Sequence, residues 1–452
     1  MLNMLSAIAH DLDLPRPLDG AVRFSTPGNL PSAFAVTEMA GVSIAAAGLA
    51  VAALIEQQAG ECHRVQVDRR LAALWFASSL RPQGWEPPPL WDAIAGDYQT
   101  RDGWIRLHTN APHHRLIAEA VLGPATDREA MARQVIAWSA GELEQAIVES
   151  GGCAAQMRSW QQWADHPQGR AVNAEPLIRR QPFDADGSRN WSGTPERPLA
   201  GVRVLDLTRI LAGPIATRLL AGFGADVLRI DPPDWDEPGV VAEVTLGKRC
   251  ARLDLREFDD RKIFERLLAQ ADILVHGYRA DALERLGYGD AQRRVLNPAL
   301  VDISLNAYGW SGPWQVRRGF DSLVQMSTGI AHAGMRWQQA SRPVPLPVQA
   351  LDHATGYLMA AAAIRGLAER LATGQGGMAR LSLARTAKWL EEQGTMPDDL
   401  PLAAETAADL GLRREQTPWG PALRLKAPLQ VVGAALHWEL GASELGSAEA
   451  CW

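Results

Sequence analysis

The stretch that decides the fold class reads Val202-Arg203-Val204-Leu205-Asp206-Leu207-Thr208-Arg209-Ile210-Leu211-Ala212-Gly213-Pro214. Residues 202–207 are rich in β-branched and aliphatic side chains, which is typical of a short buried strand. Pro214 lies near the first turn of a predicted helix that ends at about Gly222, because proline suits the start of a helix and glycine its end. The stretch therefore predicts a strand, a loop and a helix in succession.

The same alternation continues downstream. Further strands are predicted at 225–230, 272–276 and 300–305, and a helix at 259–271. Strands that alternate with helices form right-handed crossovers and a mostly parallel sheet covered on both faces. We therefore predict an α/β fold with a mostly parallel, Rossmann-like sheet. Its ligand site should lie where loops leave the carboxyl ends of the strands.

The loop at 208–214 argues against two common nucleotide sites. It contains a single glycine, Gly213, whereas a dinucleotide-binding loop has the pattern GxGxxG. The chain also lacks the GxxxxGK[ST] pattern of a P-loop. The sequence therefore argues against a nicotinamide cofactor and a P-loop nucleotide.

The composition of the 452-residue chain is that of an ordinary globular protein, with 47% apolar and 21% charged residues. Its 45 Lys and Arg residues are outnumbered by 52 Asp and Glu residues, and the net charge of −7 argues against a nucleic-acid-binding protein. The run 39–55 is uncharged but rich in Ala and Gly. We therefore expect a buried helix there and no membrane span.

The four cysteines, Cys62, Cys153, Cys250 and Cys451, are scattered along the chain. No pair has the CxxC spacing of a metal knuckle, so we expect neither a metal site nor a disulfide framework. Reduced cysteines suit a cytoplasmic protein. The N-terminal segment lacks a basic start and contains Asp11 early, so it does not predict a signal peptide.

An internal repeat relates the two ends of the chain. A shift of 314 positions places Glu38 on Asp352, Gly60 on Gly374 and Trp75 on Trp389 without a gap. Each copy consists of an acidic residue, an Ala-rich helix, a Gly turn, a short strand and another helix. The length is therefore better explained by a partial duplication than by a third independent domain.

A different region separates the two copies. Residues 98–107 predict a hairpin with an Asp-Gly turn, and helices are expected at 127–139 and 140–149. This pattern indicates a small α+β domain. The predicted organisation is a first repeat at 1–88, the small α+β domain at 89–180, a linker at 181–198, the sheet domain at 199–395, and a connection and tail at 396–452.

Several motifs occur in a fixed order from residue 198 onward. They include the segments 198–208, 211–214, 222–230 and 247–249, then Gly309-Trp310-Ser311-Gly312-Pro313 and Gly319-Phe320-Asp321. This series resembles the family III CoA-transferases, a group that also contains α-methylacyl-CoA racemases. The order of the parts departs from that family, because here a nucleophile-like segment and the small domain precede the CoA-binding half.

The resemblance implies a nucleophile and a set of CoA contacts. Asp352, before a Gly- and Ala-rich helix, holds the position of the family's nucleophilic aspartate. It would form an aspartyl-CoA thioester while CoA moves from an acyl-CoA to a carboxylic acid. The implied CoA-binding residues are Ile210 and Leu211 through their backbone, Tyr278 by packing, and Lys248, Arg249, Arg285 and Arg317 at the phosphates.

Alternative functions remain open. Phe320 stands where the racemase branch has a histidine, and because phenylalanine exchanges no proton a racemase or isomerase is less favoured. The second hypothesis is a degenerate relative that binds acyl-CoA without turnover. Glu38 is expected to be a helix cap or a vestigial residue of the repeat. A second working nucleophile at Glu38 is the less favoured hypothesis. The resemblance also implies a homodimer, which the rearranged order could partly complete within one chain.

Overall fold

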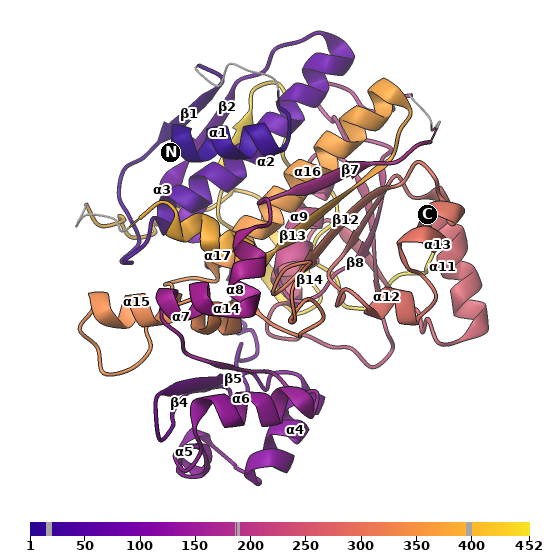
Figure 1. The fold of residues 1–452 in the computed structure, drawn as a ribbon. Coiled ribbons are helices and arrows are strands. Elements are labelled where there is room, and N and C mark those ends of the chain that lie inside the picture. The colour runs from indigo at the N-terminus through magenta and orange to yellow at the C-terminus, as the bar shows by residue number, and fades with distance from the viewer. Residues whose placement is uncertain (15–19, 186, 188–189, 395–399) are drawn as a thin grey trace.

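The computed structural model describes residues 1–14, 20–185, 187, 190–394 and 400–452. A seven-stranded sheet with the strand order β10-β9-β8-β11-β12-β13-β7 forms its centre (Figure 1). Every neighbouring pair is parallel except β13 and β7. The predicted α/β fold is therefore confirmed. The strands are β7 (Arg179–Pro182), β8 (Arg203–Leu207), β9 (Asp226–Asp231), β10 (Lys248–Arg252), β11 (Ile273–His276), β12 (Val301–Asn306) and β13 (Gly377–Ser382).

Helices cover both faces of this sheet because successive strand residues point in opposite directions. Val204 of β8 belongs to the core that contains α9 (Ala212–Gly222) and α16 (Ala350–Thr373). The next residue, Leu205, belongs to the core on the other face, with α11 (Phe258–Gln270). The expected helices at 214–222 and 259–271 are thus present, each shifted by one or two residues.

The internal repeat is visible in the structure. The helices α2 (Val36–Ala59) and α16 both have 24 residues, and each ends at a left-handed glycine, Gly60 or Gly374. A strand and a helix follow each copy in the same order. They are β2 (Val65–Asp68) and α3 (Arg69–Trp75) in the first copy, and β13 and α17 (Leu383–Glu391) in the second.

The two repeated helices α2 and α16 pack side by side (Figure 1). By length and composition α2 could cross a membrane, but 89% of its most apolar window is buried inside the protein. The apolar run of α2 therefore serves as core in this structure.

A small antiparallel sheet lies apart from the large one (Figure 1). The N–H of Thr100 donates to the carbonyl oxygen of Gly103 at 2.9 Å and closes the predicted hairpin. Three helices complete this α+β unit. Its elements are β4 (Gly96–Gln99), β5 (Trp104–Leu107), β6 (Ala154–Gln156), α4 (Pro112–Leu122), α5 (Arg128–Val135) and α6 (Ala140–Glu149).

The structure differs from the expected organisation at two places. Strand β7 falls across the predicted end of the small domain, yet it pairs with β13 of the large sheet. The expected tail is integrated, because β15 (Gly420–Arg424) pairs with β3 (Leu80–Pro82) and β16 (Leu429–Val431) with β2. The expected boundary at 395/396, and residues 186 and 188–189 of the linker, lie outside the described residues.

The remaining elements are shorter or peripheral. They are α1 (Leu2–Asp11), β1 (Val22–Ser25), α7 (Trp160–Asp165), α8 (Pro167–Asn173), α10 (Val241–Val244), α12 (Ala282–Arg285), α13 (Asp290–Leu296), α14 (Asp321–Ser327), α15 (Ile330–Trp337), η1 (Ala407–Asp409) and β14 (Glu415–Thr417). Among these, α14 matters most for the site because its first residue, Asp321, contacts the start of α16.

Candidate active site

A cavity of about 350 Å³ opens at the carboxyl edge of the large sheet. Its walls include residues that directly follow β8, β11 and β12, which are neighbours in the sheet. The chain runs from β8 to β9 and β10 on one side, then returns to β11 on the other side of β8. Loops diverge at such a reversal and leave a crevice for ligands. We call this space the carboxyl-edge cavity.

The carboxyl-edge cavity brings together five of the eight residues that the sequence singles out. They are Ile210, Leu211, Tyr278, Arg317 and Asp352. These residues are far apart in the sequence, and the order of the strands explains why they meet here.

The loop after β8 has an unusual backbone where it borders the cavity. Ile210 has a φ of 65°, which is a costly conformation for a β-branched residue. Its N–H donates to the carboxylate of Glu237 at 2.8 Å. Glu237 is itself paired with the buried Arg229. This contact holds the strained loop in place beside the cavity.

Four arginines line the carboxyl-edge cavity: Arg209, Arg279, Arg317 and Arg318. Arg209 lies over the rings of Trp235 and Tyr278, 4.5 and 5.1 Å from their centroids. Such a cluster suits an anionic ligand with phosphate groups. Three of the four, Arg209, Arg279 and Arg318, were not predicted from the sequence, although Arg209 and Arg279 stand within three residues of the ends of β8 and β11.

Arg317 is less available than the other arginines. Its guanidinium donates to Glu144 and to the carbonyl oxygen of Ala154, both at 2.9 Å. It also lies 3.9 Å from the centroid of the Trp314 ring. Arg317 therefore ties the wall of the cavity to the small α+β unit as well as adding positive charge to the wall.

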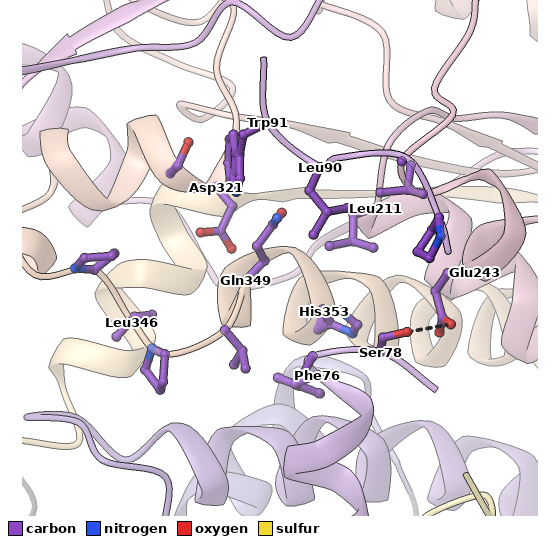
Figure 2. A pocket seen from close by; sticks show the side chains of 18 of the residues that line it. Phe76, Ser78, Leu90, Trp91, Leu211, Glu243, Asp321, Leu346, Gln349 and His353 are labelled. Atoms are coloured by element: carbon purple, nitrogen blue, oxygen red, sulfur yellow. Dashed lines mark hydrogen bonds between the residues drawn. The ribbon is translucent and has the colours of Figure 1, made fainter. Parts of the chain in front are cut away.

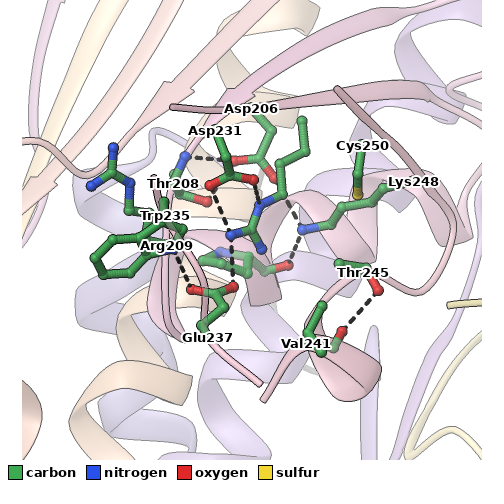
Figure 3. Close-up of polar contacts among 12 residues, drawn as sticks. Asp206, Thr208, Arg209, Asp231, Trp235, Glu237, Val241, Thr245, Lys248 and Cys250 are labelled. Carbon is green, nitrogen blue, oxygen red and sulfur yellow. Dashed lines mark hydrogen bonds and ion pairs between the residues drawn. The ribbon is translucent and has the colours of Figure 1, made fainter. Parts of the chain in front are cut away.

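Lys248 lies in a buried polar cluster and not in the cavity wall (Figure 3). Its Nζ donates to Asp206 and to the carbonyl oxygen of Pro214, each at 3.0 Å. The side chains of Lys248 and Asp206 are both fully buried. The expected phosphate contact of Lys248 is thus not supported, because this ammonium group already compensates a buried carboxylate.

The other two expected phosphate ligands also lie outside the carboxyl-edge cavity. Arg249 pairs with Asp226 at 2.9 Å, near the amino end of β9, so its expected phosphate role is not supported either. Arg285 is largely exposed on α12 and pairs with Asp281 at 2.6 Å. Its contact with a phosphate stays a prediction.

Asp352 reaches the cavity from the first turn of α16. Gly356, one turn later, lets α16 approach α9 closely. A Cβ at this position would lie 2.4 Å from the carbonyl oxygen of Ala212, so only glycine fits. The close packing of the two helices places the start of α16 beside the loop that follows β8.

A second carboxyl group lies against Asp352. The carboxylate of Asp321 accepts a hydrogen bond from the backbone N–H of Asp352 at 3.0 Å. Burial and the charge of Asp321 raise the pKa of Asp352 well above its usual value. Burial likewise raises the pKa of Asp321 to about 6. Asp321 does not cap its own helix, because Phe320 holds the N-cap position of α14 and the Asp321 carboxylate accepts from the start of α16.

A histidine from the small α+β unit approaches the same region. The ring of His108 stacks on Phe320 with 3.8 Å between centroids. His108 and Asp352 both line an adjoining cavity of about 230 Å³. Burial lowers the pKa of His108 well below its usual value, so the imidazole is neutral at pH 7. No sequence pattern near residue 108 indicates this position.

Glu38, the repeat equivalent of Asp352, has different surroundings. Its carboxylate pairs with Arg69 of α3. No side chain caps the start of α2, so the expected capping role of Glu38 is wrong. The ion pair instead fastens the first copy of the helix to the element that follows it.

Comparisons with known proteins agree with the resemblance seen in the sequence. Residues 199–418 match the model of CoA-transferase family III. An acyl-CoA transferase of Gibberella moniliformis is 28% identical over 299 residues, which are 60% of this chain and 52% of that protein. A succinyl-CoA:glutarate CoA-transferase of Mus musculus is 31% identical over 211 residues, 42% of this chain and 48% of that protein.

The chain spans about half the length of the curated relatives it matches. Among solved structures, Rv3272 from Mycobacterium tuberculosis is 28% identical, with a TM-score of 0.41. That match covers 44% of this chain and 59% of the mycobacterial chain.

Proposed function

We propose that the protein moves CoA from an acyl-CoA to a carboxylic acid, with Asp352 as the nucleophile, because residues 199–418 match the model of CoA-transferase family III. The observation that carries this proposal is the position of Asp352. It is a buried carboxyl group at the start of a long helix, on the wall of a cavity lined by four arginines. The phosphates of CoA would bind near the arginines and the thioester near Asp352.

The first half of the proposed reaction consists of two substitutions. A carboxylate oxygen of Asp352 attacks the thioester carbonyl carbon, and the C–S bond breaks. CoA departs as its thiolate, and a mixed anhydride between Asp352 and the donor acid remains. The thiolate then attacks the aspartyl carbonyl carbon and breaks its bond to the anhydride oxygen. The donor acid departs as its carboxylate, and an aspartyl-CoA thioester remains.

The second half reverses these steps with the acceptor acid. Its carboxylate attacks the aspartyl thioester, thiolate leaves, and the thiolate then attacks the acceptor carbonyl carbon. The new acyl-CoA forms and the Asp352 carboxylate is regenerated, with no net transfer of protons. Negative charge develops at the carbonyl oxygens beside the start of α16, where the helix dipole stabilises it.

The repeat supplies a matched pair of variants for testing the nucleophile. Asp352→Asn should lower the rate of CoA transfer by at least about 10³-fold, because an amide cannot act as the nucleophile. Glu38→Gln alters the equivalent position outside the cavity and should leave the rate within about twofold. Equal losses in the two variants, or activity retained in Asp352→Asn, would contradict the assignment.

Two alternative functions predict results that differ from those of a CoA-transferase. A degenerate acyl-CoA-binding relative would bind CoA but transfer none with any acid. The position of His108, which lines the adjoining cavity together with Asp352, is the observation for a second candidate, a racemase or isomerase, although its lowered pKa makes its ring a weak base. Incorporation of solvent deuterium at that carbon without CoA transfer would support this candidate.

A further inference from the structure

A second and larger cavity of about 480 Å³ lies beside the site (Figure 2). One wall is formed by residues 76–91, which join the first repeat to the small α+β unit, and another by residues 345–349 before α16. Trp419 of the C-terminal region also lines it. Its walls are mainly aromatic and aliphatic, and they include Phe76, Leu80, Trp85, Trp91 and Leu346. We call this space the apolar cavity.

The apolar cavity communicates with Asp352 through the adjoining cavity of about 230 Å³. That smaller space shares Leu90, Trp91 and Asp321 with the apolar cavity, and Ile210 and Asp352 with the carboxyl-edge cavity. A molecule whose carbonyl carbon lies at Asp352 can therefore extend toward the apolar cavity while CoA occupies the carboxyl-edge cavity.

The charges in the walls of the apolar cavity disfavour a second carboxylate. Three carboxyl groups line it, those of Asp97, Glu243 and Asp321. The cation among the described wall residues is Arg106, which Asp97 engages at 2.7 Å. Glu243 is paired with Arg218 and Arg424. A dicarboxylic acid would therefore place its distal charge in a buried site whose neighbouring cations are already paired, which is costly.

Two uncharged polar groups are also present in these walls. His353 stacks on Phe76 with 4.9 Å between centroids, and burial lowers its pKa to about 3, so its ring is neutral. The hydroxyl of Ser322 is buried and has no hydrogen-bond partner among the described residues. Ser322 lines both the apolar and the adjoining cavity, so its hydroxyl can donate to an acid carboxylate near Asp352.

We propose that the apolar cavity selects monocarboxylic acids with a bulky apolar tail, such as an aliphatic chain of about eight carbons, over short dicarboxylic acids. The tail would lie against the tryptophans and leucines of the cavity, and the carboxylate near Asp352 and Ser322. This inference rests on the proposed CoA transfer for its reaction and on the cavity alone for its binding preference.

A series of acceptor acids tests the selectivity. Each methylene that moves from water into an apolar site improves binding about fourfold. Octanoate has four methylenes more than butanoate, so we expect its kcat/KM to be higher by roughly 250-fold, and glutarate to be no better than butanoate. A kcat/KM for glutarate that equals or exceeds that for octanoate would overturn the proposal.

An exposed wall residue allows the preference to be weakened without disturbing the core. Leu90 is 53% exposed and lines both the apolar and the adjoining cavity. Leu90→Arg adds a cation there and should lower the preference for octanoate over glutarate at least tenfold. Leu412→Arg is the matched control at a fully exposed leucine and should leave the preference unchanged.

Binding to the inactive Asp352→Asn variant separates this inference from the proposed function. Trp85, Trp91 and Trp419 line the apolar cavity, so octanoate should change tryptophan fluorescence saturably and glutarate should not. Tight octanoate binding that Leu90→Arg weakens would support the cavity even if no CoA transfer is found. Octanoate binding no tighter than glutarate binding would overturn the inference even if transfer occurs.

Discussion

Asp352 and Asp321 are two buried carboxyl groups from different helices that meet at the start of α16. Their mutual repulsion and their burial disfavour two negative charges at this place. A carboxylate with a raised pKa is a stronger nucleophile once ionised, and it is poorly solvated in this position. Burial of the pair therefore lowers the stability of the fold, and it would make Asp352 reactive once this residue is ionised. This combination is common in active sites.

The pair predicts the pH dependence of CoA transfer. As the proposed nucleophile, Asp352 would attack only when ionised, and its pKa is raised, so the rate should rise with pH through that raised pKa. Asp321→Asn removes the nearby negative charge, so the acid limb of kcat/KM should move to lower pH. The pH profiles of the two proteins measure this shift, and an unchanged or upward-shifted limb would contradict the coupling.

Stability provides an independent check on the same pair. Since the folded pKa of Asp352 exceeds the unfolded one, the charged form destabilises the fold, and this cost appears as the pH rises above the unfolded pKa. Asp352→Asn should therefore raise the Tm at pH 8 but not at pH 3. This gain is specific to a strained carboxyl group, because loss of an ordinary hydrogen-bonded carboxylate would lower the Tm.

At the scale of elements, the loop after β8 supplies Arg209, one of the four arginines in the wall of the carboxyl-edge cavity. Arg209→Ala removes a guanidinium that stacks on two aromatic rings and faces the proposed CoA site. We expect the KM for acyl-CoA to rise about tenfold, with kcat changed by less than about threefold, as for loss of one charge-assisted contact.

Arg249→Ala is the control for this loop, because Arg249 pairs with Asp226 outside the cavity. Its KM should stay within about twofold of the parent value. An effect of Arg249→Ala as large as that of Arg209→Ala would restore the phosphate role expected from the motif at 247–249.

The elements themselves were predictable where their signals are local. The strand and helix around Pro214 follow from residues close in sequence, and so does the hairpin at 98–107. Strand β7 gives no comparable signal, because its partner β13 lies about 200 residues farther along the chain. A pairing at that separation depends on the assembled sheet and not on the residues of either strand.

The site residues divide in the same way: some follow from local sequence signals, and others depend on contacts that form only in the assembled fold. The position of Asp352 follows from the motif and the repeat, and Ile210 and Leu211 from the loop that leaves β8. The burial of Lys248 depends on Asp206, which precedes it by about 40 residues, so a motif alone cannot separate an ion pair from a phosphate ligand. His108 reaches the site only because the small α+β unit packs beside α14.

For the whole molecule, the rearranged order still yields a continuous site. Walls of the apolar and adjoining cavities come from three parts of the chain. These are residues 76–91, which join the first repeat to the small α+β unit, then β4 and β5 of that unit, and α14 and α16 of the segment that matches the family model. The first repeat packs its long helix on α16 within the same chain. A homodimer stays a prediction, to be checked by sedimentation equilibrium.

The proposed reaction requires a covalent bond between Asp352 and CoA in this assembled site. The protein is incubated with octanoyl-CoA without acceptor, quenched and digested, and the peptides are analysed by mass spectrometry before and after hydroxylamine treatment. We expect CoA attached to the peptide that contains Asp352, and its conversion by hydroxylamine to a hydroxamate at that residue. An unmodified Asp352 in protein that binds CoA, or CoA attached to a different residue, would contradict the account.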